Sequence, residues 1–539
     1  MDKNHPCFTF GLCHNNILMT ESTLITALQQ AQIYNHPVTE IRLFETHISW
    51  IILTGDYAYK IKKPVDLGFL DFSSLDKRKY YCEQELQLNQ RLAPDVYLEV
   101  VSITGTTEQP QINGRGAIFE YAVKMRQFEP QLQLDILLQQ DKLSSDHIDQ
   151  LADTVANFHQ QIETATEDSP FGTVEVVWQP MQENFDQIRP RLEDETELPR
   201  LEHLHQWSKQ NFKQLKPVIT ARKRNGFVRN CHGDMHLTNI TLIDNKVTLF
   251  DCIEFNDNFR WIDVISEIAF TTMDLIDRQR PELAARLLDR YLQRTGDYAG
   301  LALLQLYQVY RALVRAKVAI IRHSQSGLTK TEQQQSLQQY KDYSQLAQRF
   351  TQAKHATLYI AHGVSGSGKT SLSQPLLEHF GIIRLRSDVE RKRLFGLSAE
   401  AKSQSATDQG IYTKSTSQQT YQRLIELSRY TIKAGYNCVV DATFLKRQQR
   451  QLFHDLANQL GVPFVILHFY ADEKLLRQWI TERQELGNDA SEATIEVLEH
   501  QLKTEQPLTE TEADQIISID SGQDDAVERL ITAVTLTKI

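Results

Sequence analysis

A glycine-rich stretch in the second half of the chain has the spacing of a phosphate-binding loop. Gly363 to Thr370 read Gly-Val-Ser-Gly-Ser-Gly-Lys-Thr and fit G-x-x-x-x-G-K-[ST] at every position. Glycines let successive backbone N–H groups turn inward around an anion, and the helix expected after the stretch adds its partial positive charge. The stretch therefore predicts a site for a nucleoside triphosphate.

Each side chain of this loop has an expected task. Lys369 would neutralise the β and γ phosphates, and the Thr370 hydroxyl would reach a bound Mg²⁺. The residues expected to hold the nucleotide are Gly363, Gly366, Ser367, Gly368, Lys369 and Thr370. A glycine-rich turn without a ligand is the disfavoured alternative.

Two acidic residues stand where the following strands should end. Asp388 is followed by Arg391 one helical turn later, so the carboxylate can take a proton from an attacking hydroxyl while the guanidinium orients a phosphate. Asp441 ends an apolar run, from which it can hold Mg²⁺ or its water. A helix cap with a surface arginine, and an Asx turn, remain the alternatives.

A second constellation lies in the first half of the chain. His232-Gly-Asp234-Met-His236-Leu-Thr-Asn239 is followed by an apolar strand ending in Asp251. An acid, an amide five residues later and a second acid at a strand end form the layout of a kinase catalytic loop with its metal-binding aspartate. Zinc binding by the two histidines is disfavoured because no third ligand is evident.

A kinase of this layout also needs a lysine on an early strand and a glutamate on a helix. Ala58 and Lys60 share one face of the strand expected at Tyr57–Lys62, and Lys60 is our choice, with Lys62 in reserve. Glu85 is the preferred partner and Glu83 the second choice. No glycine-rich loop precedes this strand, which disfavours a protein kinase.

These motifs need two different frameworks. Strand-like runs alternate with helix-like runs after Ala356, which predicts an α/β P-loop domain with a parallel sheet. The first half opens with strand-like runs and turns helical after about Leu132, which predicts an α+β bilobal domain. A glutamine-rich, solvent-facing helix should link them. The expected domains are 1–324, a helical linker at 325–355, and 356–539.

The second half resembles small kinases related to zeta toxins and to the 5'-kinase module of polynucleotide kinases. The resemblance rests on the phosphate loop, on Asp388 with Arg391, on Val440 to Phe444, and on the segment from Leu476 to Ala493. In such proteins the last segment is a lid whose arginines approach the nucleotide phosphates. This implies that role for Arg483 and for Arg477.

The first half resembles aminoglycoside phosphotransferases and their relatives with a protein-kinase-like fold. The resemblance implies Asp234 as catalytic base, Asn239 and Asp251 as metal ligands, and His232 as a residue that shapes the loop. The whole chain resembles the proteins called bifunctional aminoglycoside phosphotransferase/ATP-binding protein. That name describes folds more securely than substrates.

Composition narrows the remaining choices. The 539 residues are 41% hydrophobic and 24% charged with a formal charge of -11, which excludes collagen-like, low-complexity and wholly disordered chains. The cysteines show no C-x-x-C spacing, and no uncharged apolar run approaches the roughly 18 residues of a membrane span. We expect a cytoplasmic protein without a membrane partner.

The sequence thus predicts an ATP- or GTP-dependent kinase with Mg²⁺ at two centres. The expected partners are small hydroxyl acceptors: a sugar-like molecule at the first centre, and a nucleotide sugar or another phosphorylated molecule at the second. A basic cluster beside Asp388 favours such an anion: Arg384, Arg386, Arg391, Lys392 and Arg393. The alternatives are a nucleotide-responsive regulator, a toxin-like module, or a kinase of polynucleotide 5'-hydroxyls, which the acidic charge disfavours.

Overall fold

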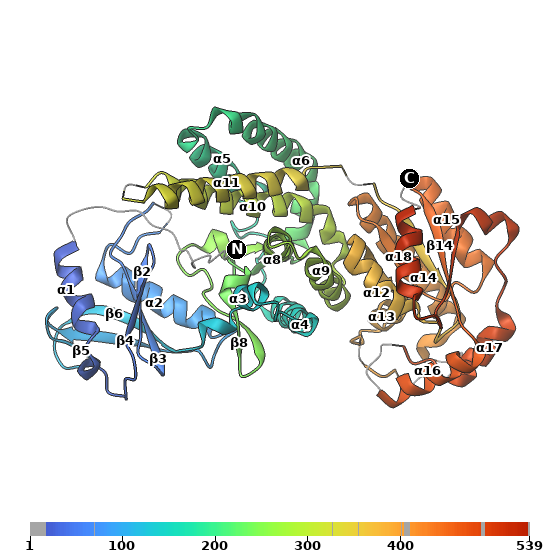
Figure 1. The fold of residues 1–539 in the computed structure, drawn as a ribbon, viewed down its shortest axis with the longest axis horizontal. Helices are drawn as coiled ribbons and strands as arrows, with labels where there is room; N and C mark the ends of the chain where they lie inside the picture. Colours follow the sequence, from blue (N-terminus) through green and yellow to red (C-terminus); the bar gives the residue numbers. More distant parts are fainter. Residues whose placement is uncertain are drawn as a thin grey trace. The chain divides into compact units, whose positions relative to one another are not determined.

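The computed structural model describes most of the chain, as two compact units (Figure 1). The described residues are 18–68, 70–325, 327–353, 355–399, 401–403, 410–486 and 491–536. Unit 1 comprises Met1–Leu151, Gln161–Asp277 and Gln305–Thr351, and unit 2 comprises Ala152–Gln160, Arg278–Leu304 and Gln352–Ile539. Within the described ranges, no helix has both the length and the apolar character that crossing a bilayer requires.

Unit 1 contains a six-stranded antiparallel sheet in the order β1-β2-β3-β6-β4-β5. Its strands are β1 (Arg42–Glu45), β2 (Ser49–Leu53), β3 (Tyr57–Lys62), β4 (Tyr97–Gly105), β5 (Pro110–Ile112) and β6 (Ile118–Arg126). Tyr59 and Ile61 pack in one apolar core with helix α1 (Leu18–Leu28), whereas Ala58 packs in another with Cys82 of helix α2 (Leu75–Asn89). Because side chains alternate along a strand, Lys60 and Lys62 share the face of Ala58, toward α2.

The rest of unit 1 is mainly helical, with two small antiparallel sheets that carry the His232 motif. Its strands are β7 (Val228–Asn230), paired with β10 (Trp261–Asp263), and β8 (Ile240–Ile243), paired with β9 (Lys246–Leu249). The helices after the large sheet are α3 (Leu134–Gln139), α4 (Ser145–Gln161), α5 (Val174–Ile188), α6 (Leu198–Arg224), α7 (Asp257–Arg260), α8 (Val264–Asp277), α10 (Leu301–His323) and α11 (Lys330–Phe350). Of α4, residues 152–160 belong to unit 2, as do residues 301–304 of α10.

Helix α11 covers most of the stretch expected as a solvent-facing linker, and the structure corrects that expectation. Tyr340, Leu346 and Phe350 of α11 lie in the buried core that unit 1 builds from α5, α6, α8 and α10. Few apolar residues suffice because they recur on one side of the helix. The glutamines of α11 lie mainly on its outer face, so the composition of the stretch did not indicate its buried side.

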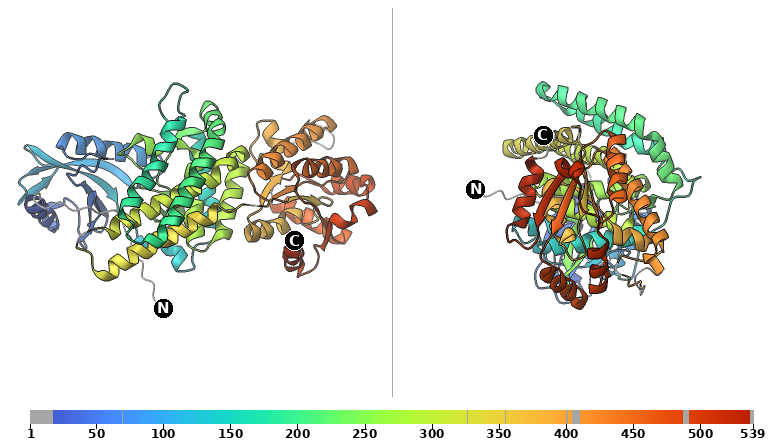
Figure 2. Two further views of the ribbon diagram at one scale, coloured as in Figure 1. Left: turned by 90° about the horizontal axis from the view of Figure 1, so that it is seen from above. Right: turned by 90° about the vertical axis from the view of Figure 1, so that its right-hand side faces the viewer.

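Unit 2 contains a five-stranded parallel sheet in the order β12-β13-β11-β14-β15, which confirms the α/β prediction. The strands are β11 (Leu358–His362), β12 (Ile383–Arg386), β13 (Cys438–Asp441), β14 (Phe464–Tyr470) and β15 (Ile516–Asp520). Helices lie on both faces of this sheet (Figure 2). The helices that lie wholly in unit 2 are α9 (Pro281–Thr295), α12 (Lys369–Phe380), α13 (Ser387–Leu394), α14 (Lys414–Lys433), α15 (Arg447–Leu460), α16 (Glu473–Leu486), α17 (Ile495–Thr504) and α18 (Ala526–Leu536).

Candidate active sites

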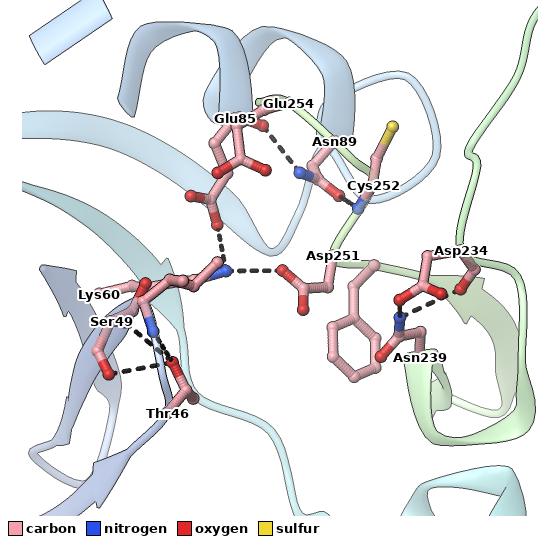
Figure 3. A network of polar contacts seen from close by, with 12 residues as sticks. Thr46, Ser49, Lys60, Glu85, Asn89, Asp234, Asn239, Asp251, Cys252 and Glu254 are labelled. Atoms are coloured by element: carbon pink, nitrogen blue, oxygen red, sulfur yellow. Dashed lines mark hydrogen bonds and ion pairs between the residues drawn. The ribbon is translucent and has the colours of Figure 1, made fainter. Parts of the chain in front are cut away.

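In unit 1 the strand lysine and the helical glutamate meet. Lys60 Nζ lies 2.7 Å from Glu85 Oε1 and 2.6 Å from Asp251 Oδ1 (Figure 3). Burial by itself would lower the pKa of Lys60, but the two carboxylates raise it well above its usual value. The ammonium therefore stays charged, and it lies beside the aspartate expected to hold the metal.

Lys62, the reserve choice, has a separate place in the same cluster. Its Nζ lies 2.7 Å from Glu85 Oε2 and also forms an ion pair with Glu254, a residue that the sequence reading did not single out. Glu83, the second choice of partner, instead pairs with Lys79 on an exposed face of α2. The structure thus joins both lysines to Glu85.

The predicted catalytic loop brings Asp234 and Asn239 together. Asn239 Nδ2 donates to Asp234 Oδ2 at 2.9 Å, and His236 Nε2 lies 3.4 Å from the same oxygen. Burial would raise the pKa of Asp234, but neighbouring charge, chiefly His236, holds it well below its usual range. His232 bonds the Phe250 carbonyl oxygen at 2.9 Å, a structural contact that agrees with the loop-shaping role implied for it.

Side chains of α8 and α10 hold the backbone of this loop, and the sequence reading missed them. Glu267 accepts hydrogen bonds from the His232 and Gly233 N–H groups, while Arg311 donates to the Gly233 carbonyl at 3.1 Å. Glu267 and Arg311 are almost fully buried. Acidic and basic residues inside apolar helices were the available signal, because buried charges need partners.

The donor atoms of unit 1 fit a hard divalent cation. Asp251 offers a carboxylate whose side chain is 37% exposed, and Asn239 offers its amide oxygen, since its nitrogen is engaged with Asp234. Oxygen ligands of this kind suit Mg²⁺. Figure 3 shows Asp251 between Lys60 on one side and Asp234 with Asn239 on the other. Asp251 also has a positive φ of 63°, the kind of backbone strain found at functional sites.

In unit 2 the phosphate loop joins β11 to α12 as predicted. Gly363 has a φ of 146°, and a Cβ there would collide with the Phe469 carbonyl oxygen, so the tight turn requires glycine. Lys369 Nζ donates to the Gly363 and Val364 carbonyl oxygens at 2.9 and 2.7 Å. Burial lowers the pKa of Lys369 to about 8.

The metal-binding residues predicted for unit 2 also meet. Thr370 Oγ1 donates to Asp441 Oδ2 at 2.7 Å, so a hydroxyl and a carboxylate from α12 and β13 lie side by side. This pair of oxygen donors fits Mg²⁺. Thr370 follows Lys369 in the chain, and Asp441 ends β13, the strand that pairs with β11.

A glutamine occupies one amide of the phosphate loop. Gln501 Oε1, on α17, accepts a hydrogen bond from the Ser365 N–H at 2.7 Å. Ser365 belongs to the loop whose N–H groups are expected to hold phosphate. The contact joins positions 136 residues apart, and no local pattern marks it.

Asp388 and Arg391 lie together at the start of α13. Arg391 Nη1 is 3.4 Å from Asp388 Oδ1, and the guanidinium lies over the Tyr412 ring at 5.1 Å from its centroid. In the part of the chain that the structure describes, Arg391 Nε is buried without a hydrogen-bond partner. This arginine is therefore poised to bind an anion.

The rest of the basic cluster expected beside Asp388 is largely neutralised within unit 2, which corrects that expectation. Arg384 pairs with Asp289 at 3.0 Å, Lys392 lies 3.3 Å from Glu492, and Arg393 pairs with Glu390. Arg384 and Lys392 are buried. Arg391, in contrast, pairs with the candidate base Asp388 itself.

The two lid arginines differ in their surroundings. Arg483 donates a hydrogen bond to the Ala493 carbonyl oxygen at 3.0 Å. After burial, its positive charge is a further cause that lowers the pKa of Lys369. Arg477 instead pairs with Glu473 at 2.7 Å and with Glu499 at 2.9 Å on the helix surface. Both contacts are with carboxylates of α16 and α17, not with residues of the phosphate loop. Residues 487–490 of the expected lid lie outside the described residues.

Comparison with known proteins agrees with this division of chemistry. Residues 74–304 match the family model described as phosphotransferase enzyme family, and residues 358–508 match the one described as AAA domain. With the fold and both sites, these matches define a two-part kinase-type enzyme: a protein-kinase-like phosphotransferase domain followed by a P-loop kinase domain. The predicted fold class is confirmed.

Two curated relatives align with most of this chain. Uncharacterized proteins of Mycobacterium tuberculosis and Mycobacterium bovis are 29% identical over 465 residues, covering 85% of this chain and 89% of theirs. Among solved structures, a choline/ethanolamine kinase family protein from Mesorhizobium loti covers 62% of this chain and 100% of its own, with 8% identity and a TM-score of 0.36. A gluconokinase from Sinorhizobium meliloti covers 34% and 99%, with 19% identity and a TM-score of 0.25.

Proposed function

We propose that the protein is a phosphotransferase with two kinase-type centres, each moving the γ-phosphoryl group of ATP or GTP to an acceptor hydroxyl. One observation supports the proposal: each unit combines a carboxylate that could accept a proton with a buried lysine and with oxygen donors that suit Mg²⁺. In unit 1 the carboxylate is Asp234, and in unit 2 it is Asp388. A switch that only binds nucleotide needs no proton acceptor.

At the first centre, Asp234 is the residue that takes the proton of the acceptor hydroxyl. Its depressed pKa keeps it ionised, and the hydrogen bond from Asn239 fixes its orientation. Lys60, charged and held by Glu85, is placed to bind nucleotide phosphates. Asp251 and Asn239 would hold Mg²⁺, which would neutralise charge on the transferring group. We propose a small sugar-like acceptor here.

At the second centre, Asp388 is the proton acceptor and Arg391 binds an anionic group of the acceptor or the transferring phosphoryl. Among the described residues its Nε has no hydrogen-bond partner, and its guanidinium lies over the Tyr412 ring; both support this role. Lys369 and the loop amides hold the nucleotide, and Arg483 assists from the lid. Thr370 and Asp441 would hold Mg²⁺, which would neutralise phosphate charge. We propose a phosphorylated small molecule, such as a nucleotide sugar, as acceptor.

The test is a search for labelled products. The purified protein is incubated with a metabolite extract, Mg²⁺ and ATP labelled in its γ-phosphate, alongside Asp234→Asn and Asp388→Asn variants. Each variant should lose one class of labelled product, with a rate reduced about 10²- to 10⁴-fold. ATP loss that continues unchanged in both variants, with no labelled acceptor, would overturn the proposal in favour of a regulator. Labelled oligonucleotide 5' ends in place of small products would indicate a kinase of polynucleotide 5'-hydroxyls.

A further inference from the structure

Helix α9 belongs to the compact unit that contains the phosphate loop, although residues 74–304, which include it, match the phosphotransferase family model. Asp289 of α9 is 3% exposed. Its carboxylate accepts hydrogen bonds from Arg384 Nη2 at 3.0 Å and from the Arg384 backbone N–H at 3.3 Å. A buried acid from one family segment thus pairs with a buried base from the other.

Arg384 continues the connection into the first turn of α12. Its Nη1 donates to the Thr370 carbonyl at 3.1 Å, and its Nη2 donates to Gln374 Oε1 at 2.7 Å. Thr370 is the residue that offers a hydroxyl to the metal. Arg384 also lies on β12, three residues before α13 begins at Ser387.

The same stretch of chain holds α13 through further contacts. Arg393 of α13 donates to the Gln293 carbonyl of α9, and the Tyr298 hydroxyl donates to the Arg384 carbonyl at 3.4 Å. Helix α13 carries Asp388 and Arg391. Residues from 278–304 therefore bear on both the nucleotide side and the acceptor side of the second centre.

We propose that Asp289 is a positioning residue of the P-loop centre, supplied from within the phosphotransferase-type segment, which holds Arg384 against Thr370. The inference rests on the proposed nucleotide site of unit 2 and goes beyond it, because it makes the second centre depend on residues outside the P-loop segment. Asp289 acts through Arg384 and touches no reacting atom. A carboxylate is needed because Arg384 is a buried cation whose orientation its counter-ion fixes.

Asp289→Asn keeps the shape and one acceptor oxygen but removes the charge. We expect about tenfold weaker binding of Mg²⁺ with AMP-PNP at the P-loop centre, since a misplaced first turn of α12 weakens every phosphate contact. Binding is measured by calorimetry on the full chain in an Asp251→Asn background, which weakens the first centre. In a Lys369→Ala background, the first centre should bind equally with and without Asp289→Asn.

Asp153→Asn is the matched control, because Asp153 pairs with Arg290 and Arg294 of the same helix without touching Arg384. It should change affinity by less than about twofold. The double variant Asp289→Leu/Arg384→Met separates positioning from stability. Removing both buried charges should restore the thermal midpoint, while affinity stays low because the Thr370 contact is missing.

Two outcomes would overturn the inference: Asp289→Asn binding within twofold of its parent, or a double variant that regains affinity together with stability. If Asp289→Asn fails to fold, the double variant decides between these outcomes. If the parent protein, with Asp289 intact, binds no nucleotide at the P-loop centre, the proposed function itself is refuted. This failure is distinguishable because it is seen before Asp289 is changed.

Discussion

Buried Lys62 offers a test of the charge arrangement on β3. Its side chain is 1% exposed and pairs with Glu85 and with Glu254, itself 4% exposed. Methionine has a similar length without the charge, so Lys62→Met leaves the Glu254 carboxylate buried without its ammonium. Removing one partner of a buried pair costs about 3–5 kcal/mol, and we expect the free energy of unfolding of unit 1 to fall by that amount.

The double variant Lys62→Met/Glu254→Gln should recover at least half of this loss, because no buried charge then lacks a partner. The loss should also depend on pH. Burial already raises the pKa of Glu254, and loss of Lys62 raises it further. Folding then takes up a proton, so stability is lost as pH rises through the folded-state pKa, and the deficit is larger near about pH 8 than near about pH 5.

Urea unfolding followed by tryptophan fluorescence measures this. Four of the five tryptophans lie in unit 1: Trp50, Trp178, Trp207 and Trp261. The control is Lys63→Met, one residue along the chain, because Lys63 pairs with the exposed Glu45. Such an exposed pair contributes less than about 1 kcal/mol.

The reasoning fails if Lys62→Met unfolds at the same urea concentration as the parent, or if the double variant is no more stable than the single one. It also fails if Lys63→Met costs as much as Lys62→Met. The first result would mean that water or rearrangement compensates Glu254 without a counter-ion. The last would mean that burial does not govern the energy of these pairs.

Other predictions concern the second centre and the support of the first. Raising the pH from about 7 to about 9 should weaken binding of Mg²⁺ with ATP at the P-loop centre about tenfold, because Lys369, whose pKa is about 8, loses its proton; calorimetry showing constant affinity would contradict this. Gln501→Ala should tighten the same binding about 2- to 10-fold by freeing the Ser365 N–H, and weaker binding would show that Gln501 contacts the nucleotide instead. Glu267→Gln should lower turnover at the first centre at least about tenfold with an unchanged acceptor KM, because one loop N–H loses its acceptor; steady-state kinetics with unchanged turnover would remove Glu267 from the positioning role.

The elements that carry local signals were predicted well. β3 has the predicted bounds, Tyr57–Lys62, because it is a short run of alternating side chains bounded by turn residues. Lys60 was chosen because Ala58-Tyr-Lys60 matches the kinase V-A-I-K strand, and the structure places both Lys60 and the reserve choice Lys62 2.7 Å from Glu85. Period and spacing suffice when the partners lie on neighbouring elements.

Residues that support the loop from a distance gave no such signal. Glu267 lies 34 and 35 residues from the two N–H groups it binds, and Arg311 lies 78 residues from Gly233. Their positions follow from how α8 and α10 pack in unit 1, which no local pattern encodes. The clue lay in composition: Glu267 and Asp274 are seven residues apart on one face of a mainly apolar helix, and both are buried.

Domain boundaries failed to follow from composition for a related reason. The glutamine-rich run suggested a division at 325–355, yet α11 packs in unit 1 and α9 packs in unit 2. The boundary of a compact unit is set by where buried charges and apolar faces find partners, and Asp289 finds Arg384 across 95 residues. A fragment that begins at residue 356 would keep every motif of the P-loop centre, but it would leave Arg384 without its counter-ion. Motifs therefore locate the chemistry of the second centre, while the residues that stabilise it extend into the segment that matches the other family.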